Sequence, residues 1–431
     1  YSMRNVLINQ NPHWEAPYKS LYPRQVLQPL LAKLDLRQIQ VLQGIRRSGK
    51  SSIFKLLINQ LLATEVAGSI FYVNLDDPFF IQYANNPAGL YEVIQTAERL
   101  TQQKIKYLFL DEVQAINGWE KYVKSIYDSA EFKKIFITGS NSSLLSGEYA
   151  TLLTGRYLAT QIYPLSFNEI LAINNINNFL QLNKQLPKVL KLLDDLMLYG
   201  SFVEVYDAPE EVKREIITSY YETILLKDCV ANNKIRDVKG FKQLSFYLTT
   251  NLTALFSYSA LARAIKISDV AVKDYIAALE NSFLFSELNQ FSYSLKQQAS
   301  SKKKLYLTDN SFLQLGFSFS KNYGTQLENL VLAELKKQGA EVYFYNQANE
   351  CDFIVKQENK LIALQVCYQL NEHNQEREIK GLTQLPFEVD EKIVITYNQT
   401  GEQAQIKEIL EEELNAGIKI LPFWEYFSNW A

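Results

Sequence analysis

Cysteine and histidine are scarce in this chain of 431 residues. The three cysteines, Cys229, Cys351 and Cys367, form no Cys-x-x-Cys pair, so neither a disulfide framework nor a tetrahedral zinc site is expected. With only two histidines, His13 and His373, the chain is not expected to use Ser-His-Asp catalysis or a histidine proton relay. A reducing, cytoplasmic setting is therefore predicted.

Long apolar runs and a surplus of basic residues are also missing. No segment reaches the ~18 apolar residues that a membrane helix needs, and residues 1–10 lack the apolar core of a signal peptide, so no membrane association is expected. The chain has 44 Lys and Arg against 47 Asp and Glu, a formal net charge of -3. Nucleic acid could therefore be bound only through a local basic patch. Length and composition predict a soluble protein of more than one domain.

Hydrophobic periodicity predicts an α/β protein whose segments differ in character. From residue 37 to about 165, apolar runs alternate with helical patterns, which predicts a parallel sheet covered on both faces. Its strands are expected at 39–43, 70–75, 107–110 and 135–138. The helical period of about 3.6 residues then prevails to residue 235. Three short helices and a hairpin at 283–291 are consistent with a winged helix-turn-helix. A smaller α/β region follows, in which a helix is expected at 403–414.

Residues 44–51, Gly-Ile-Arg-Arg-Ser-Gly-Lys-Ser, match the P-loop pattern and lie between a predicted strand and a predicted helix. Glycines let backbone N–H groups approach phosphate oxygens at the start of that helix. Lys50 is expected to neutralise the β- and γ-phosphates, and the Ser51 hydroxyl to ligate Mg²⁺. The residues expected to hold the nucleotide here are Gly44, Arg47, Ser48, Gly49, Lys50, Ser51 and Ser52.

Two further strand ends carry candidate catalytic groups. The strand at 107–110 ends in Asp111 and Glu112, which are expected to position Mg²⁺ and to accept a proton from the attacking water. The strand at 135–138 leads to Ser140 and Asn141, which either lie near the γ-phosphate or form an ordinary strand-end turn.

Arg156 is a candidate for stabilising charge in the transition state. It would act in cis, or in trans as an arginine finger in a neighbouring copy, which makes an oligomer one of the expectations. Arg46 and Arg47 compete for this role, and a solvated surface position is the commoner fate of an arginine.

Several of these segments together resemble bacterial and archaeal AAA+-type ATPases related to the STAND class. The resemblance lies in residues 44–51, in the run DEVQAINGWE at 111–120, and in 137–145, 153–157 and 164–169. It implies an ATPase domain at 1–165, a helical lid or connector at 166–235, a winged helix at 236–295 and a restriction-endonuclease-like domain at 296–431. It also implies ATP as the nucleotide. It strengthens the case for Arg156 as the residue that stabilises the transition state, because the motif L-x-G-R recurs among members of the family.

The resemblance continues beyond the ATPase domain. Residues 199–205, YGSFVEV, resemble a family motif YGG-F-P-E-V, from which Ser201 and Val203 depart. Asp309, Glu328 and Asn329 fall where the family has K-x-Y-x-x-D and then a helix with E-N.

The nuclease-like motif of the C-terminal segment is incomplete. Such a site needs an acid on a helix, an Asp at a strand start and E-x-K on the next strand. Glu328 and Asp352 fit the first two positions, but Gln365 and Cys367 occupy the third, and neither supplies a carboxylate or an ammonium group. Glu350 could replace the missing acid, yet no replacement for the lysine is evident. A structural or binding role without nuclease activity is therefore expected.

The sequence leaves the partner of this protein open. The presumed recognition helix at 268–280 mixes Lys273 with acidic residues, which suits phosphate contacts poorly. The polar stretch at 294–304 is expected to be an exposed wing tip or linker. Its run Lys302, Lys303 and Lys304 is either the best basic patch for DNA or simply solvated. Winged helices also bind proteins.

Three functions therefore compete. They are an ATP-driven switch or remodeller, a DNA-acting ATPase, and a nucleotide-binding scaffold with little turnover. Glu112 argues against the third, while Gln365 and Cys367 argue against a nuclease form of the second.

Overall fold

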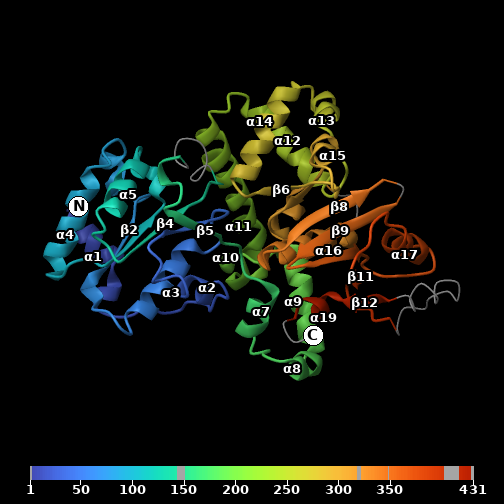
Figure 1. Cartoon of the computed structure of the whole chain (residues 1–431), viewed down its shortest axis with the longest axis horizontal. Helices are drawn as coiled ribbons and strands as arrows, with labels where there is room; N and C mark the ends of the chain where they lie inside the picture. Colours follow the sequence, from blue (N-terminus) through green and yellow to red (C-terminus); the bar gives the residue numbers. More distant parts are fainter. Residues whose placement is uncertain (1, 143–150, 318–321, 348, 402–416, 429–431) are drawn as a thin grey trace. The chain divides into compact units, whose positions relative to one another are not determined.

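A five-stranded parallel sheet forms the centre of the first part of the chain (Figure 1). In the computed structural model, residues 2–142, 151–317, 322–347, 349–401 and 417–428 are described. All neighbouring strands of the sheet run parallel, in the order β2-β3-β4-β1-β5. The strands are β1 (Ile39–Gln43), β2 (Ile70–Asn74), β3 (Tyr107–Asp111), β4 (Lys134–Gly139) and β5 (Tyr157–Gln161). The predicted parallel sheet is confirmed, and β5 is an addition to it.

Helices cover both faces of this sheet because successive strand residues point to opposite sides. Val41 packs into the cluster formed with α1, α4 and α5, whereas Leu42 packs with α2 and α3 on the other face. These helices are α1 (Met3–Gln10), α2 (Leu27–Leu31), α3 (Lys50–Leu61), α4 (Gly89–Thr101) and α5 (Trp119–Asp128). Short 3₁₀ helices lie at η1 (Pro12–Trp14), η2 (Ala67–Ser69), η3 (Pro78–Tyr83) and η4 (Val113–Ala115).

Residues 1–164 and 281–283 form one compact unit, and residues 165–280 and 284–431 form a second. The second unit begins with helices, as its sequence period predicts. They are α7 (Phe167–Ile173), α8 (Phe179–Lys184), α9 (Leu186–Tyr199), α10 (Val203–Asp207), α11 (Glu210–Thr223) and a π-helical segment, η6 (Ile224–Ala231). A capping box between Ser166 and Glu169 starts α7.

A three-helix segment and a two-stranded antiparallel sheet follow. The elements are α12 (Val238–Thr250), α13 (Tyr258–Ile265), α14 (Asp269–Asn281), β6 (Phe285–Leu288), α15 (Leu295–Ser300) and β7 (Lys304–Leu307). β6 and β7 pair with Leu288 opposite Lys304, so the stretch predicted as a polar tip or linker contains a helix and the start of a strand.

The prediction that Lys302, Lys303 and Lys304 form an exposed basic patch is wrong. Only Lys302 is exposed. Lys303 forms an ion pair of 2.7 Å with Glu287, and Lys304 is buried with 3% of its side chain exposed. Pairing with β6 draws this run into the sheet, so two of its three charges are neutralised within the chain.

The chain ends in a mixed sheet with strand order β12-β11-β10-β9-β8, in which β8, β9 and β10 run antiparallel and β10, β11 and β12 run parallel. Its strands are β8 (Glu341–Asn346), β9 (Glu350–Gln357), β10 (Lys360–Val366), β11 (Glu391–Thr396) and β12 (Ile418–Pro422). The other elements are η7 (Asn310–Leu315), α16 (Tyr323–Lys337), α17 (Gln375–Thr383) and α19 (Phe423–Phe427). The helix predicted at 403–414 lies outside the described residues.

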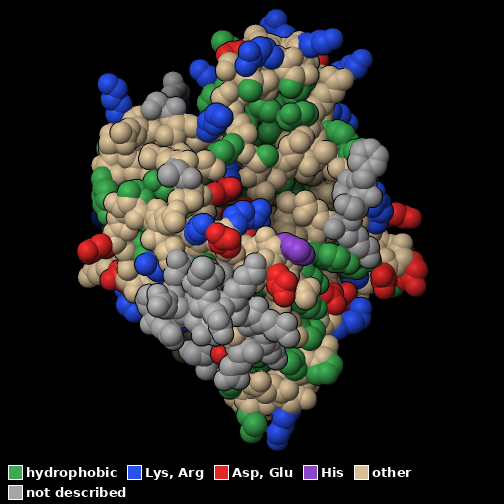
Figure 2. Space-filling view, turned by 90° about the vertical axis from the view of Figure 1, so that its right-hand side faces the viewer, with side chains coloured by type: hydrophobic (Ala, Val, Ile, Leu, Met, Phe, Trp, Pro, Cys, Tyr) green, Lys and Arg blue, Asp and Glu red, His purple; other side chains and the backbone are tan. Residues whose placement is uncertain are grey.

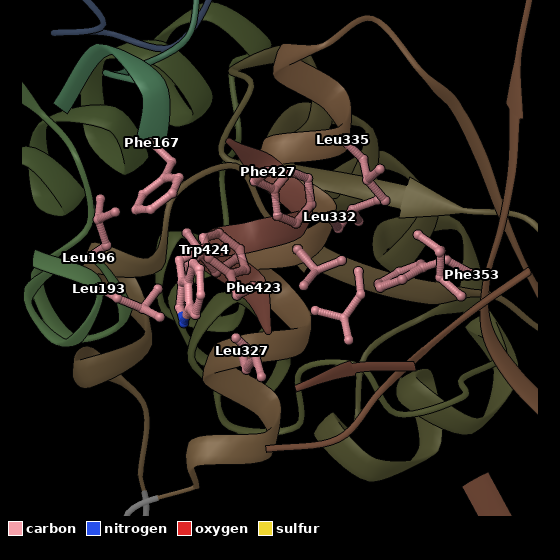
Figure 3. Packing of buried hydrophobic residues seen from close by; sticks show 14 of the residues in the cluster. Phe167, Leu193, Leu196, Leu327, Leu332, Leu335, Phe353, Phe423, Trp424 and Phe427 are labelled. Carbon is pink, nitrogen blue, oxygen red and sulfur yellow. The ribbon is translucent and has the colours of Figure 1, made fainter. Parts of the chain in front are cut away.

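One apolar core joins the first helices of the second unit to its mixed sheet. Phe167 of α7 and Leu193 of α9 lie in the same cluster as Leu332 of α16 and Phe353 of β9 (Figure 3). The rings of Phe167 and Phe423 meet edge to face, 5.3 Å apart.

Two motifs of the family resemblance meet in this unit and serve the fold. Oδ2 of Asp309 accepts hydrogen bonds from the backbone N–H (3.0 Å) and the hydroxyl (2.9 Å) of Ser201. Gly200 has a φ of 69°, and a Cβ there would lie 1.8 Å from Asp309 Oδ1. Asn329 bonds to both the N–H and the carbonyl of Leu307, which ties α16 to β7. Within the described residues, no helix has the length and apolar character needed to cross a membrane.

Candidate nucleotide site

The loop at 44–49 connects β1 to α3 through several residues with positive φ. The φ angles are 155° at Gly44, 70° at Arg47 and 98° at Gly49. A Cβ on Gly44 would lie 2.1 Å from the carbonyl oxygen of Ile162, so only glycine fits there. Arg47 tolerates the left-handed conformation at some cost in strain, and its side chain is exposed. The backbone path of the loop is thus fixed by its sequence.

Lys50, the first residue of α3, turns its side chain under this loop. Its ammonium donates hydrogen bonds to the carbonyls of Gly44 (3.0 Å) and Ile45 (3.1 Å), and only 4% of the residue is exposed. The Ser48 hydroxyl is also buried and has no hydrogen-bond partner among the described residues. A buried orphan donor in such a loop fits a ligand that offers acceptor oxygens, such as a phosphate. Ser51 and Ser52 follow in the first turn of α3 and are half-buried.

Arg24 braces the loop from outside the motif. Its guanidinium donates to the carbonyls of Ser48 (3.2 Å) and Tyr163 (2.6 Å) and is largely buried. Arg24 cannot be predicted from the sequence, because it precedes the loop in a segment without clear periodicity and matches no motif.

Both oxygens of the Asp111 carboxylate accept hydrogen bonds from hydroxyl groups. Tyr72 of β2 donates to Oδ2 at 2.7 Å, and Thr138 of β4 donates to Oδ1. The Tyr72 hydroxyl also interacts with the side chain of Ser51. Burial, reinforced by the charge of Asp111, holds the pKa of Tyr72 well above its ordinary value. Ser51 and Asp111, the two expected metal ligands, are therefore linked through a single hydroxyl group.

Glu112 has an unusual backbone and a perturbed carboxyl group. Its φ is 55°, and its N–H donates to the Thr138 hydroxyl at 2.9 Å. Burial raises the pKa of the carboxyl group, the charge of Asp111 raises it further, and the charges of Lys50 and Arg46 oppose the rise. The Gln114 amide donates to the same carboxyl group. A carboxylate with a raised pKa beside the loop is suited to accept a proton.

Ser140 and Asn141 lie at the edge formed by the carboxyl ends of the strands. Both are buried, with 1% and 3% exposed, and they follow β4, which lies between β3 and β1. The loop, the Asp111–Glu112 pair and these two residues therefore all follow the carboxyl ends of adjacent parallel strands. This edge is where open α/β sheets bind ligands.

Arg156 is not brought to this edge. It precedes β5, which pairs with β1 so that Tyr157 lies opposite Ile39, the first residue of β1. Arg156 therefore lies at the amino edge of the sheet, opposite the loop, and there it forms an ion pair of 3.1 Å with Asp128. This placement does not support an action in cis, and an action in trans stays a prediction.

The nuclease-like residues of the second unit gather around a separate cavity of about 660 Å³. Glu328, Asp352 and Gln365 line it. The Gln365 amide donates to Glu378 at 2.6 Å and accepts from the N–H of Asp352 at 3.2 Å. Cys367 is buried, which raises the pKa of its thiol to about 12 and keeps it protonated at neutral pH.

The fold and this edge of the sheet are those of a P-loop protein with an AAA domain. Residues 36–171 match the AAA domain family. Two domains of unknown function follow, DUF8612 at 190–321 and DUF4143 at 323–425.

The chain belongs to the family of an uncharacterized protein of Methanocaldococcus jannaschii, MJ1544. It is 34% identical to that protein over 412 residues, which cover 91% of this chain and 89% of the relative. An uncharacterized protein of Haemophilus influenzae is 32% identical over 358 residues, or 81% and 87% of the two chains.

Solved structures with a partial likeness include the Aeropyrum pernix ORC1 protein in complex with DNA. That match has 13% identity and a TM-score of 0.34, and it covers 78% of this chain and 100% of the other. AMPPCP-bound DnaA from Aquifex aeolicus matches with 15% identity and a TM-score of 0.29, over 63% of this chain and 92% of the other.

Proposed function

We propose that this protein binds and hydrolyses ATP in a Mg²⁺-dependent manner and acts as a nucleotide-driven switch or remodeller of the AAA+ type related to the STAND class. The observation that carries the proposal is the arrangement at one sheet edge. There the phosphate-type loop, the Asp111–Glu112 pair and the Ser140–Asn141 pair follow adjacent strands.

The residues at this edge have different proposed roles in binding the nucleotide and the metal ion. Backbone N–H groups of 44–49 and the Lys50 ammonium bind the β- and γ-phosphates, with the orphan hydroxyl of Ser48 as a further donor. Ser51 and Asp111 offer the hard oxygen ligands that Mg²⁺ prefers, and the Tyr72 hydroxyl links them. When bound, the metal ion neutralises charge on the phosphate oxygens.

Glu112 is the group that accepts the proton in the proposed reaction. Water adds to the γ-phosphorus, the bond from that phosphorus to the bridging oxygen of the β-phosphate breaks, and Glu112 takes the proton of the water. Its raised pKa, caused by burial, makes it a better acceptor than a solvated carboxylate. Ser140 and Asn141, which follow β4, are the proposed contacts of the γ-phosphate.

The remaining segments are proposed to respond to the bound nucleotide. In this scheme, 1–165 is the ATPase domain, 166–235 the lid or connector, 236–295 the winged helix and 296–431 the restriction-endonuclease-like domain. A protein partner would then bind the second unit in one nucleotide state.

ATP hydrolysis by the full chain and by Glu112→Gln tests this function. We expect Glu112→Gln to bind ATP with Mg²⁺ as the wild type does and to lose about 10²- to 10⁴-fold in turnover, the usual contribution of a general base. Glu92→Gln, which removes an exposed carboxylate of α4, is the matched control and should keep full turnover. Wild-type chain that binds no ATP, or Glu112→Gln that hydrolyses ATP normally, would overturn the proposal.

A second candidate function is DNA binding by the segment α12 to α14. Figure 2 shows Lys and Arg side chains gathered over this end of the second unit (top of the view), and Arg263, Lys266 and Lys273 are exposed there. Duplex binding should then weaken with salt, and replacing all three by alanine should reduce the salt slope by up to about 3, near one per lost phosphate contact. Lys302→Ala, at an exposed lysine outside this segment, is the control. A slope unchanged in the triple variant would reject this surface.

A further inference from the structure

The cavity of the second unit contains a buried lysine among acidic side chains. Its most buried charged groups are Glu378 (2% exposed), Lys304 of β7 (3% of the side chain), Asp352 of β9 (8%) and Glu328 of α16 (15% of the side chain). Glu378 forms an ion pair with Arg377. Glu350, which is half exposed, lies nearer the opening. Figure 2 shows acidic and basic side chains side by side on this face of the second unit.

Lys304 forms ion pairs with two of these carboxylates. Its Nζ lies 2.7 Å from Glu350 Oε1 and 3.9 Å from Glu328 Oε1. Burial lowers the pKa of Lys304, but the charges of Glu328, Asp352 and Glu350 together outweigh it, so the pKa is raised above its ordinary value. The side chain therefore carries a full positive charge in the middle of the cluster.

The carboxylates have few other partners. Asp352 Oδ2 accepts the N–H of Val366 at 2.9 Å, while Oδ1 accepts no hydrogen bond from the residues that the structure describes. Oε1 of Glu328 accepts the hydroxyl of Tyr306 at 2.7 Å. Burial raises the pKa of Glu328 and holds that of Asp352 well above its ordinary value, and the charge of Lys304 opposes both rises. Lys304 is thus the cation that favours the ionised form of both carboxyl groups.

The presence of Gln365 is consistent with a cavity in which a side chain of the protein supplies the positive charge. With an amide instead of a carboxylate at this position, the cluster has one negative charge fewer for a single ammonium to balance. Both ends of the amide are hydrogen-bonded within the chain, because Nε2 donates to Glu378 and Oε1 accepts from the N–H of Asp352. With Lys304 in place, no three His, Cys, Asp or Glu side chains in the described part of the chain are spaced to hold a metal ion.

We propose that Lys304 is the built-in cation of this cavity: its ammonium pairs with Glu350 and Glu328 beside Asp352, takes the place of a divalent metal ion, and keeps such ions out. The lysine comes from β7, far from the sequence position at which Cys367 stands. This inference concerns the second unit alone and does not depend on ATP hydrolysis by the first.

Binding of Mn²⁺ to the full chain, measured without nucleotide by electron paramagnetic resonance, tests the proposal. Asp111→Asn serves as the background, because it removes the candidate metal ligand of the first unit. In that background, Lys304→Met is expected to bind Mn²⁺ about 10- to 100-fold more tightly than the unaltered cavity, the range over which groups beside a metal site change its affinity. Adding Asp352→Asn should abolish the gain, and Lys302→Met should not produce it.

Two results would overturn the proposal. One is Mn²⁺ binding by the unaltered cavity that Asp352→Asn removes, which would make Lys304 an accessory to a metal site. The other is a folded Lys304→Met chain that gains no affinity. Thermal unfolding establishes which variants fold, and Lys304→Gln, which retains a polar head group, takes the place of Lys304→Met if the latter does not.

Discussion

The hydroxyl group of Tyr72 donates a hydrogen bond of 2.7 Å to Oδ2 of Asp111 across the neighbouring strands β2 and β3. Thr138, from the strand on the other side of β3, donates to Oδ1 of the same carboxylate. Asp111 therefore has its orientation fixed from both sides before any ligand binds. Such preorganisation removes a cost that a flexible carboxylate would carry on binding.

Removing the Tyr72 hydroxyl should weaken this arrangement. Tyr72→Phe leaves a buried carboxylate with one donor fewer, and we expect the free energy of unfolding to fall by about 1–3 kcal/mol, as measured by urea denaturation. Tyr91→Phe is the matched control, since it removes a hydroxyl that pairs with Ser125 at 3.0 Å on the surface. Equal losses in the two variants would mean that Asp111 gains nothing particular from Tyr72.

The backbone of the loop at 44–49 gives a second prediction. Gly44→Ala places a Cβ 2.1 Å from the Ile162 carbonyl oxygen, so the loop must shift away from β5. We expect a loss of at least about 3 kcal/mol in unfolding free energy, together with loss of ATP binding in an equilibrium dialysis measurement.

Gly155→Ala separates the clash from backbone strain. Gly155 has a φ of 78°, but a Cβ there would meet nothing within 4 Å. This variant should lose only about 1–2 kcal/mol, the cost of a left-handed residue. If Gly44→Ala were no worse than Gly155→Ala, the close approach to Ile162 would not constrain the loop.

Asp309 is expected to contribute to the stability of the folded chain and not to ATP hydrolysis. Asp309→Ala leaves the buried N–H groups of Ser201 and Ser311 without their acceptor, which should cost about 2–5 kcal/mol in chemical denaturation. The exposed Asp274→Ala is the control and should change stability by less than about 0.5 kcal/mol. ATP turnover per folded molecule should be unchanged in both variants, whereas a specific loss of turnover in Asp309→Ala would give this residue a role in the reaction.

The sequence predicts the strands and motifs that depend on a local pattern. It does not predict the contacts that depend on which strands are neighbours in the sheet. The runs at 39–43 and 107–110 are apolar throughout because both faces of these strands are buried, so their strands were found. Strand β5 is partly exposed along its length and carries Thr160 and Gln161, which hides it. It lies at the edge of the sheet, where one side has no neighbouring strand among the described residues.

The same distinction between local pattern and strand order explains which residues of the candidate site are predictable from the sequence. The loop and the Asp111–Glu112 pair are recognisable because their chemistry needs fixed spacing along the chain. Tyr72 and Thr138 reach Asp111 only because β2, β3 and β4 are neighbours, which no local pattern encodes. Lys304 was expected in solvent for a similar reason, since its burial follows from pairing between β6 and β7.

Stability should also depend on pH through the buried His13. Its Nε2 lies 3.0 Å from the carbonyl oxygen of Ile70, which can only accept, so Nε2 carries the proton, and Nδ1 lies 3.1 Å from the Tyr18 hydroxyl. Burial lowers the pKa of His13 from 6.5 to about 4. Between these two values the unfolded chain binds a proton that the folded chain does not, so stability rises with pH through this window.

The contribution of His13 is thus fully present above pH 6.5 and is lost as the pH falls towards about 4. It amounts to about 3 kcal/mol at most, from 1.4 kcal/mol per pH unit of separation. Unfolding free energies measured by urea denaturation across this range should show a shallower slope in His13→Gln than in the wild type. His373→Gln is the matched control at an exposed position. If both variants changed the slope alike, proton uptake by the unfolded chain at His13 would not explain the pH dependence, and the acid-sensitive groups would have to lie elsewhere in the fold.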